Sequence, residues 1–127
     1  MSDTIGRIGW IDMSVDDADG VRDFYKAVVG WESSDHDMGE YADFNMHLPG
    51  AGPIVAGIVH ARGPNADVPP RWMAYINVAD VERSAAQCVE LGGEIVVPLR
   101  RHGDNGYVVI RDPAGAVCAL YGPVSGA

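Results

Sequence analysis

The feature that most constrains this sequence is an internal repeat that uses almost its whole length. An offset of 63 residues places Val15 on Val78 and Gly30 on Gly93, and two such copies fill 126 of the 127 positions. A supersecondary unit that occurs twice cannot bury its apolar face alone, because that face needs a partner to pack against. The chain is therefore expected to fold as two similar modules within one domain.

Each copy starts with a pattern that predicts a strand. Over residues 7–15 the side chains alternate, as in a strand whose two faces meet different surroundings. Met13 and Val15 fall on an apolar face, which is expected to receive a helix, while Trp10 and Asp12 fall on the other face. A bare tryptophan there would be unfavourable unless it lines a cavity or an interface.

A helix is predicted directly after each of these strands. The first, over about residues 18–29, has an N-cap at Asp16 or Asp17 and stops at Gly30, which readily adopts the left-handed conformation. The apolar residues at helical spacing that are expected to face the sheet are Val21, Phe24, Tyr25 and Val28. The second helix, over about residues 80–91, repeats this pattern. Its inward residues are expected to be Val81, Ala85 and Cys88.

Three short strands are predicted after each helix, separated by polar or Pro-Gly segments. In the first copy they cover residues 31–34, 41–48 and 54–60. In the second copy a strand over 71–78 precedes the helix, and the later strands lie near 95–97, 107–111 and 117–121. The fold class is therefore α+β, with a strand–helix–three-strand (βαβββ) unit used twice.

The domain boundaries follow from this repeat. Residues 1–127 are expected to form a single domain, with module one at about 5–60 and module two at about 71–122. Between them, residues 61–70 hold a Gly-Pro-Asn segment and two adjacent prolines, a composition typical of a linker.

Composition and charge exclude several classes of protein. Apolar residues make up 47% and charged residues 21%, which is typical of a globular chain, and no apolar run reaches the roughly 20 residues of a membrane span. The first residues lack the basic start and apolar core of a signal peptide, which predicts a cytoplasmic protein. The net charge of −9 repels phosphate backbones and anionic lipids, so neither nucleic acid nor a membrane is an expected partner.

The two cysteines, Cys88 and Cys118, are expected to be small buried groups in a reducing compartment. Both fall in a predicted helix-to-sheet layer, so a disulfide between them stays possible. A nucleophilic role would need a neighbouring base, and no histidine lies near either cysteine in the sequence.

A set of short motifs accompanies the repeat. In chain order they are Gly9-Trp10, Asp17, Phe24-Tyr25, Gly30-Trp31, Trp72, Tyr75, Val78, Asp80, Gly92-Gly93 and Asp112-Pro113-Ala114-Gly115-Ala116. In this combination they resemble the vicinal oxygen chelate superfamily, which contains glyoxalases, bleomycin resistance proteins and extradiol dioxygenases. The resemblance implies two tandem βαβββ modules forming a curled mixed sheet around a central cavity for a small molecule, usually in a homodimer. It does not fix the chemistry, because one fold hosts many activities.

The resemblance also provides a test for a metal site. Enzymes of this family take one ligand from the first strand and one Glu from the last strand of each module. Those positions correspond here to Trp10, Met73 and Ala119, and the fourth falls within residues 53–59, which are all apolar, Gly or Pro. None of these side chains suits a hard or borderline divalent ion. The protein is therefore expected to bind no metal and to use no cofactor.

The same positions indicate which side chains face the cavity. The predicted ligand-binding residues are Trp10, Asp12, Met73, Tyr75, Asn77, Ala119 and Tyr121, with His47 and His60 added because they lie near strand ends. This mixture of aromatic, apolar and a few polar groups is typical of a pocket for an organic ligand. The alternative is that Trp10, Met73 and Tyr121 are simply core residues.

Asp12 is the candidate catalytic residue, because a carboxylate on the wall of a cavity needs a hydrogen-bonding partner or a catalytic role.

A basic segment covers residues 98–106, where Arg100, Arg101 and His102 lie close together in an otherwise acidic protein. This segment is expected to be a loop. The favoured interpretation is a solvated loop, and the alternative is a flap that pairs with an anionic ligand.

Three functions are compatible with these observations. The leading hypothesis is a glyoxalase- or bleomycin-resistance-like protein that binds a small organic molecule in a metal-free cavity, for sequestration or resistance. The first alternative is a metal-independent lyase or isomerase that uses Asp12 as general acid or base, supported by Tyr75, Tyr121 or a histidine. The second alternative is a dimeric scaffold whose cavity is filled. A homodimer is expected in each case.

Overall fold

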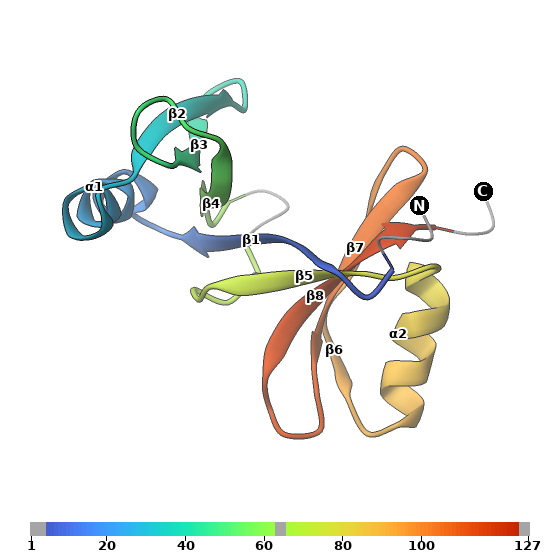
Figure 1. Cartoon of the computed structure of the whole chain (residues 1–127). Helices are drawn as coiled ribbons and strands as arrows, with labels where there is room; N and C mark the ends of the chain where they lie inside the picture. The colour runs from blue at the N-terminus through green and yellow to red at the C-terminus, as the bar shows by residue number, and fades with distance from the viewer. Residues whose placement is uncertain (1–4, 63–65, 125–127) are drawn as a thin grey trace. The chain divides into compact units, whose positions relative to one another are not determined.

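The computed structural model describes residues 5–62 and 66–124 (Figure 1). Residues 1–4, which contributed to the prediction about a signal peptide, and residues 63–65 of the predicted linker lie outside the described residues. By their internal contacts the residues divide into two compact units. Of the described residues, the first unit contains 11–62 and 66–72, and the second contains 5–10 and 73–124.

The described residues contain two helices and eight strands, and their order confirms the predicted βαβββ unit used twice. In chain order they are β1 (Ile8–Val15), α1 (Ala18–Val29), β2 (Glu32–Asp37), β3 (Ala42–His47), β4 (Ile54–His60), β5 (Met73–Asn77), α2 (Val81–Glu90), β6 (Glu94–His102), β7 (Asn105–Arg111) and β8 (Val117–Pro123). The fold class is α+β, as predicted. In the part of the chain that the structure describes, neither helix has the length and apolar character of a membrane-spanning helix.

In the first unit the strand order is β2-β3-β4-β1. The pairs β2–β3 and β3–β4 are antiparallel, whereas β1 runs parallel to β4, so this is a mixed sheet. Helix α1 follows β1 and covers one face, here called the helix face of the unit (Figure 1). In each unit, the sheet face opposite its helix is called the far face.

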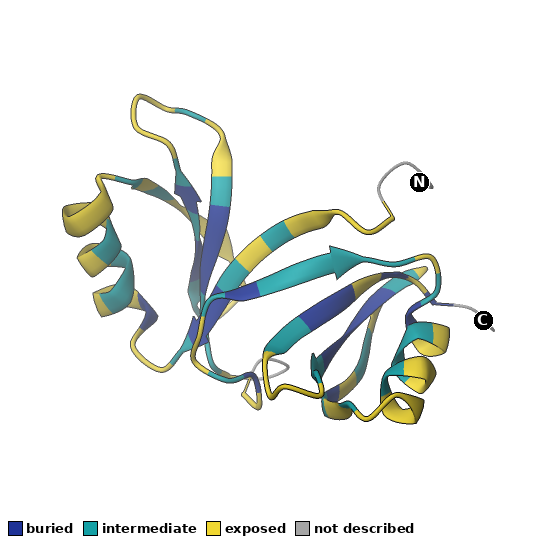
Figure 2. Ribbon diagram, turned by 60° about the horizontal axis from the view of Figure 1, so that its bottom comes forward, coloured by how far each residue is buried: buried dark blue, intermediate teal, exposed yellow. Residues whose placement is uncertain are grey.

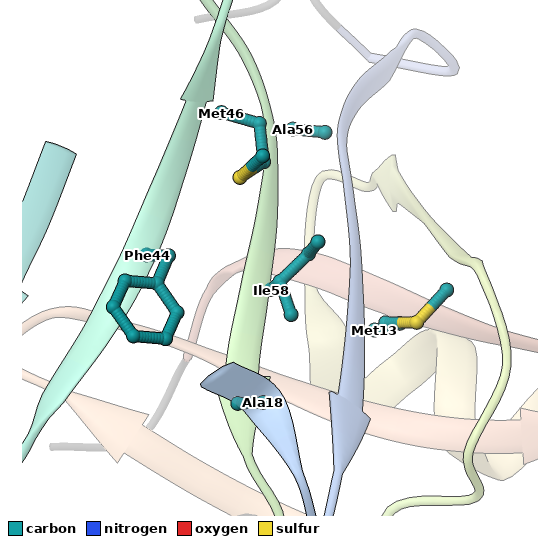
Figure 3. Close-up of a cluster of buried hydrophobic side chains, with 6 residues drawn as sticks. All are labelled: Met13, Ala18, Phe44, Met46, Ala56 and Ile58. Carbon is teal, nitrogen blue, oxygen red and sulfur yellow. The ribbon is translucent and has the colours of Figure 1, made fainter. Parts of the chain in front are cut away.

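The core of the first unit lies on its helix face. The buried side chains that gather there are Met13, Ala18, Phe44, Met46, Ala56 and Ile58 (Figure 3). Val15 packs against the same cluster, which confirms the alternation predicted for the first strand. Three aromatic rings close the edge of this core, because Tyr25 contacts Trp31 and Trp72, and the Trp72 Nε1–H donates to the Tyr25 hydroxyl at 3.1 Å.

The ends of α1 follow the predicted signals. Asp17 is the N-cap, and its Oδ1 accepts a hydrogen bond from the Gly20 N–H at 3.0 Å. Gly30 ends the helix with a φ of 87°, a conformation that a side chain with a Cβ rarely adopts.

The prediction that Phe24 and Val28 face the sheet was wrong. They are 56% and 65% exposed. The side chains of α1 that pack on the core are the buried Ala18 and the partly buried Val21 and Tyr25, so the packed stripe is narrower than the apolar stripe of the sequence. Phe24 lies to one side of this stripe and packs edge-on against the Tyr25 ring, at a centroid distance of 5.1 Å.

In the second unit the strand order is β5-β8-β7-β6, with β5–β8 parallel and the other two pairs antiparallel. Helix α2 packs on one face through a cluster of Val81, Val108 and Leu120, with Ala85 beside it. Asp80 caps α2 by accepting from the Arg83 N–H at 3.2 Å, as the repeat predicts. Both helices expose much of their outer sides (Figure 2).

The segment with Arg100, Arg101 and His102 is not a loop, which corrects the prediction for residues 98–106. These three residues are the end of β6, and they pair with Tyr107, Gly106 and Asn105 of β7. Proline is unusual inside a strand, because it cannot donate to a sheet ladder. Here β6 is the last strand in the order of its unit, and irregular register on both sides of Val97 accommodates the proline.

Two other boundaries differ from the prediction. Strand β2 continues through Asp35 to Asp37, where a polar break was expected, because an edge strand tolerates charged side chains. Within the predicted linker, Val68 is only 5% exposed. That part of the linker is therefore packed rather than open.

Candidate functional site

A row of polar side chains crosses the far face of the first unit. Asp12 of β1 pairs with Gly57 of β4, Gly57 pairs with Asn45 of β3, and Asn45 pairs with Ser34 of β2. Paired residues on neighbouring strands project to the same side of a sheet. The side chains of Asp12, Asn45 and Ser34 therefore share one face, and Gly57 places no side chain between the first two.

The next row on this face is more deeply buried. Ser14 is 3% exposed and Asp43 is 4% exposed. An oxygen of Asp43 accepts a hydrogen bond from the His60 backbone N–H at 2.8 Å. Asp12 is half-buried, and its Oδ1 atom is shielded from solvent. Apart from the exposed Ser34, these polar groups are thus recessed, whereas a solvated sheet face would expose them all.

His47 has both ring nitrogens engaged on this face. Its Nε2 lies 2.6 Å from the Ser34 hydroxyl, and its Nδ1 lies 3.0 Å from the Gly52 carbonyl oxygen. The structure thus places this predicted ligand-binding residue two positions along β3 from Asn45. Its role toward a ligand stays a prediction.

Glu32 stands opposite His47 in the β2–β3 register. Its carboxylate accepts a hydrogen bond from the Ala51 backbone N–H at 3.1 Å. This bond, then a second backbone bond from Gly50, lowers the pKa of Glu32, and the nearby charge of Lys26 lowers it further. Glu32 is therefore ionised at neutral pH and holds the turn between β3 and β4.

His60 lies on the helix face and not with Asp12. It pairs with Val15 in the β1–β4 register, and its ring packs against Tyr41 and Phe44. Its Nε2 lies 3.5 Å from a carboxylate oxygen of Asp19 in α1. The structure therefore does not bring His60 to the polar row.

The remaining predicted site residues belong to the second unit. Met73 and Ala119 are completely buried, whereas Trp10, Tyr75 and Asn77 are half-buried and Tyr121 is 37% exposed. Tyr75 pairs with Ala119 and Asn77 pairs with Tyr121, so these four share the far face of the second unit. Their role in ligand binding stays a prediction.

The far face of the second unit carries rings rather than carboxylates. Tyr107 pairs with Tyr121 across β7 and β8, and its ring contacts Tyr75 at a centroid distance of 6.0 Å. His102 stacks on the other side of Tyr107, at 6.3 Å and an interplanar angle of 16°. The histidine predicted in a basic loop is therefore part of an aromatic row.

The residues at the family's metal positions do not fit a divalent ion. Met73 offers only a soft thioether, while Trp10 and Ala119 offer no donor at all. Within the described ranges, no three His, Cys, Asp or Glu side chains gather as a metal site would require. No step of a mechanism is therefore assigned to a metal.

The two cysteines are free thiols and half-buried. Burial raises the pKa of the Cys118 thiol, and the charges of Asp112 and Cys88 raise it further. A thiol whose pKa is raised is a poor nucleophile at neutral pH.

Ser34 and Asn45 are the site residues that sequence reasoning missed. The signal was present in β3, where Asp43, Asn45 and His47 alternate with the buried Phe44 and Met46. This alternation gives one polar and one apolar face. The pairing between residues of β2 and residues of β3 depends on the register of the two strands. The sequence of a single strand does not specify that register.

Comparisons with known proteins agree with this architecture. Two curated relatives are 29% identical: the putative glyoxylase CFP32 of Mycobacterium tuberculosis, over 91% of this chain and 45% of that protein, and the anthracycline biosynthesis protein DnrV of Streptomyces peucetius, over 87% and 39%. The chain thus spans less than half the length of these relatives.

Solved structures share the fold at low sequence identity. A methylmalonyl-CoA epimerase variant from Streptomyces coelicolor has a TM-score of 0.56 at 17% identity, covering 95% of this chain and 96% of that one. A superfamily member from Vibrio splendidus 12B01 has a TM-score of 0.56 at 11% identity, covering 89% and 96%. A family model matches residues 7–120. The chain therefore belongs to the Glyoxalase/Bleomycin resistance protein/Dioxygenase superfamily.

Proposed function

We propose that this protein binds a small organic molecule without a metal, on the far face of the first unit, with Asp12 as the polar centre of the site. The observation that carries the proposal is the register-aligned row of Asp12, Asn45 and Ser34. A few recessed polar groups can orient a ligand by hydrogen bonds, while apolar surroundings supply binding energy.

The relatives support an organic ligand. The epimerase of the same fold was solved in complex with 2-nitronate-propionyl-CoA, an organic anion. DnrV is named for the biosynthesis of anthracyclines, which are aromatic compounds. The proposed ligand class is therefore an organic compound with an aromatic or carbonyl-rich part, and the proposed role is sequestration or resistance.

The test is a thermal-shift screen of aromatic and acyl compounds, followed by calorimetry on the best binder. Asp12→Asn should weaken binding by about 10- to 100-fold, because a charge-assisted hydrogen bond contributes about 1.5–3 kcal/mol. Asp104→Asn is the matched control, since Asp104 is an exposed turn residue of the second unit. Equal affinities for both variants and the wild type would contradict the proposal.

Enzymatic use of Asp12 is the second candidate function, favoured by the shielding of its Oδ1 atom from solvent. A carboxylate in such surroundings can take a proton from a carbon acid. Deuterium exchange into an α-acidic thioester or ketone should then proceed with the wild type and stop with Asp12→Asn. Exchange at the uncatalysed rate with the wild type would leave binding as the function.

We also infer a homodimer. The exposed apolar residues of α1, Phe24 and Val28, support a further interface, because soluble proteins rarely leave such patches uncovered. Light scattering at micromolar concentration should give about twice the chain mass of 13.5 kDa. A single species at the chain mass would contradict the dimer.

A further inference from the structure

We propose that Ser34 is an activated nucleophile that reacts with acyl esters, with His47 as its general base. This proposal goes beyond ligand binding at Asp12 and does not depend on it. Its basis is the pair of contacts made by the His47 ring, at 2.6 Å to the Ser34 hydroxyl and 3.0 Å to the Gly52 carbonyl. A nucleophile, a base and a group that orients the base are the three parts of such a centre.

The chemistry of these contacts fixes the tautomer of the ring. A backbone carbonyl can only accept a hydrogen bond, so Nδ1 of His47 carries the hydrogen and donates to Gly52. In a neutral ring Nε2 then has no hydrogen and can only accept. The Ser34 hydroxyl therefore donates to Nε2, which is the direction of proton transfer that a serine nucleophile requires.

The Gly52 carbonyl is held in place by a bonded turn. The Gly52 N–H donates to the Leu48 carbonyl at 3.0 Å, and the Leu48 N–H donates to the Pro53 carbonyl at 3.1 Å. The carboxylate of Glu32 fixes the Ala51 N–H, and Ala51 has a φ of 57°, which is uncommon for a residue with a side chain. The ring of His47 is thus oriented by a turn with few alternative arrangements.

The surroundings of Ser34 also allow an ester to reach its hydroxyl and offer a group that can stabilise the negative charge of the reaction intermediate. Ser34 is exposed while His47 is half-buried, so an ester in solution can reach the hydroxyl. Asn45 pairs directly with Ser34, so the Cβ atoms of the two residues lie about 5 Å apart on the same face of the sheet. An amide N–H at this place can donate to the oxyanion of a tetrahedral intermediate.

The proposed reaction has two balanced steps. The Ser34 oxygen attacks the ester carbonyl and its proton passes to Nε2 of His47; the carbon–oxygen bond to the alcohol then breaks, and the alcohol leaves with that proton. Water next attacks the acyl-Ser34 ester, giving its proton to His47. The acid leaves and the Ser34 hydroxyl is restored. The substrate class is an ester of a carboxylic acid with a small alcohol or phenol.

The competing explanation is that the two bonds of His47 only fix the β3–β4 turn to β2. The two explanations differ in what they predict for a reactive ester. Wild-type protein mixed with 4-nitrophenyl acetate should release a burst of nitrophenolate of about one equivalent, and peptide mapping by mass spectrometry should place the acetyl group on Ser34.

The variants separate the outcomes. Ser34→Ala should abolish both the burst and the acetylated peptide while keeping the contact between His47 and Gly52. Ser33→Ala is the matched control on the same strand, because Ser33 pairs with Met46 of the helix face and should react as the wild type does. His47→Gln should slow acylation by about 100-fold or more. Circular dichroism shows whether that variant folds.

An acetyl group found only on Lys26 or another amine, or equal bursts from the wild type and Ser34→Ala, would overturn the proposal. The two proposals fail independently. Loss of ligand binding in Asp12→Asn with no acylation of Ser34 would keep the binding function and reject the nucleophile. Acylation of Ser34 with unchanged binding in Asp12→Asn would do the opposite.

Discussion

The two units share one topology but differ in the chemistry of their far faces. In the first unit, the row that starts at Asp12 continues through Gly57 and Asn45 to Ser34. In the second unit, the row that starts at Tyr75 consists of residues without charge. Its other members are Ala119, Val109 and Val97, all completely buried.

The helix faces of the units are alike. Each helix starts at an aspartate cap, Asp17 or Asp80, and each packs on a small cluster of buried apolar side chains. The comparison teaches that the repeated pattern specifies the helix face, which stabilises each unit. The far face is not specified in this way, and the two copies have different side chains there: polar groups in the first unit and buried apolar groups in the second. The candidate chemistry is accordingly in one unit and not in both.

The largest expected change in stability comes from placing a polar side chain on the far face of the second unit and an apolar one on the far face of the first. Val109→Asn in the second unit should lower the free energy of unfolding by about 1–3 kcal/mol, because it buries an amide among apolar groups. Asn45→Val in the first unit should change it by less than about 1 kcal/mol. Urea denaturation of both variants measures the difference. Equal losses at the two positions would mean that the far faces are not different environments.

Two glycines at equivalent positions of the repeat, Gly30 and Gly93, should respond differently to a methyl group. At Gly93 a Cβ atom would lie 2.5 Å from the Cys88 Sγ and 2.9 Å from the Arg111 carbonyl oxygen, so Gly93→Ala should cost about 1–3 kcal/mol through crowding. At Gly30 a Cβ atom meets no other atom within 4 Å, and only the φ of 87° is unfavourable. Gly30→Ala should therefore cost about 1 kcal/mol. Thermal unfolding of both variants would show it, and a larger loss for Gly30→Ala would contradict the account.

The smallest expected effect concerns Glu32, whose lowered pKa reports hydrogen bonds to the turn of the first unit. A carboxyl whose pKa is lower in the folded state stabilises the fold above its unfolded pKa, and this stabilisation is lost as the pH falls through the folded pKa. The wild type should therefore melt slightly above Glu32→Gln at pH 7, and the two should converge toward pH 3. The change Glu90→Gln on the exposed side of α2 in the second unit serves as the control. A constant difference across this pH range would show that ionisation of Glu32 does not matter.

The fold was largely readable from the sequence, because each of its determinants is local. The alternation in residues 7–15, the caps at Asp17 and Asp80 and the stop at Gly30 each predict one element, and the structure has all of them. The strand across Pro98 was missed, because a bulge that tolerates proline depends on the neighbouring strand.

The candidate site was readable only in part. Asp12 was found because one strand's alternation is enough to place it. Ser34 and Asn45 were missed, because their contact with each other depends on the pairing of β2 with β3. The prediction that His60 lies with Asp12 was wrong, because it pairs with Val15 of the helix face. It rested on the position of His60 near a strand end, and this position does not indicate toward which face of the sheet the side chain points.

The most direct test of the central claim is an NMR titration of the labelled protein with the best binder from the screen. The account predicts that the amide signals of Asp12, Asn45 and Gly57 shift together with one dissociation constant, while those of Val21 and Ala85 on the two helix faces stay constant. Shifts confined to the helix-face residues, with Asp12 and Asn45 unchanged at saturation, would contradict the claim that the far face of the first unit is the binding site.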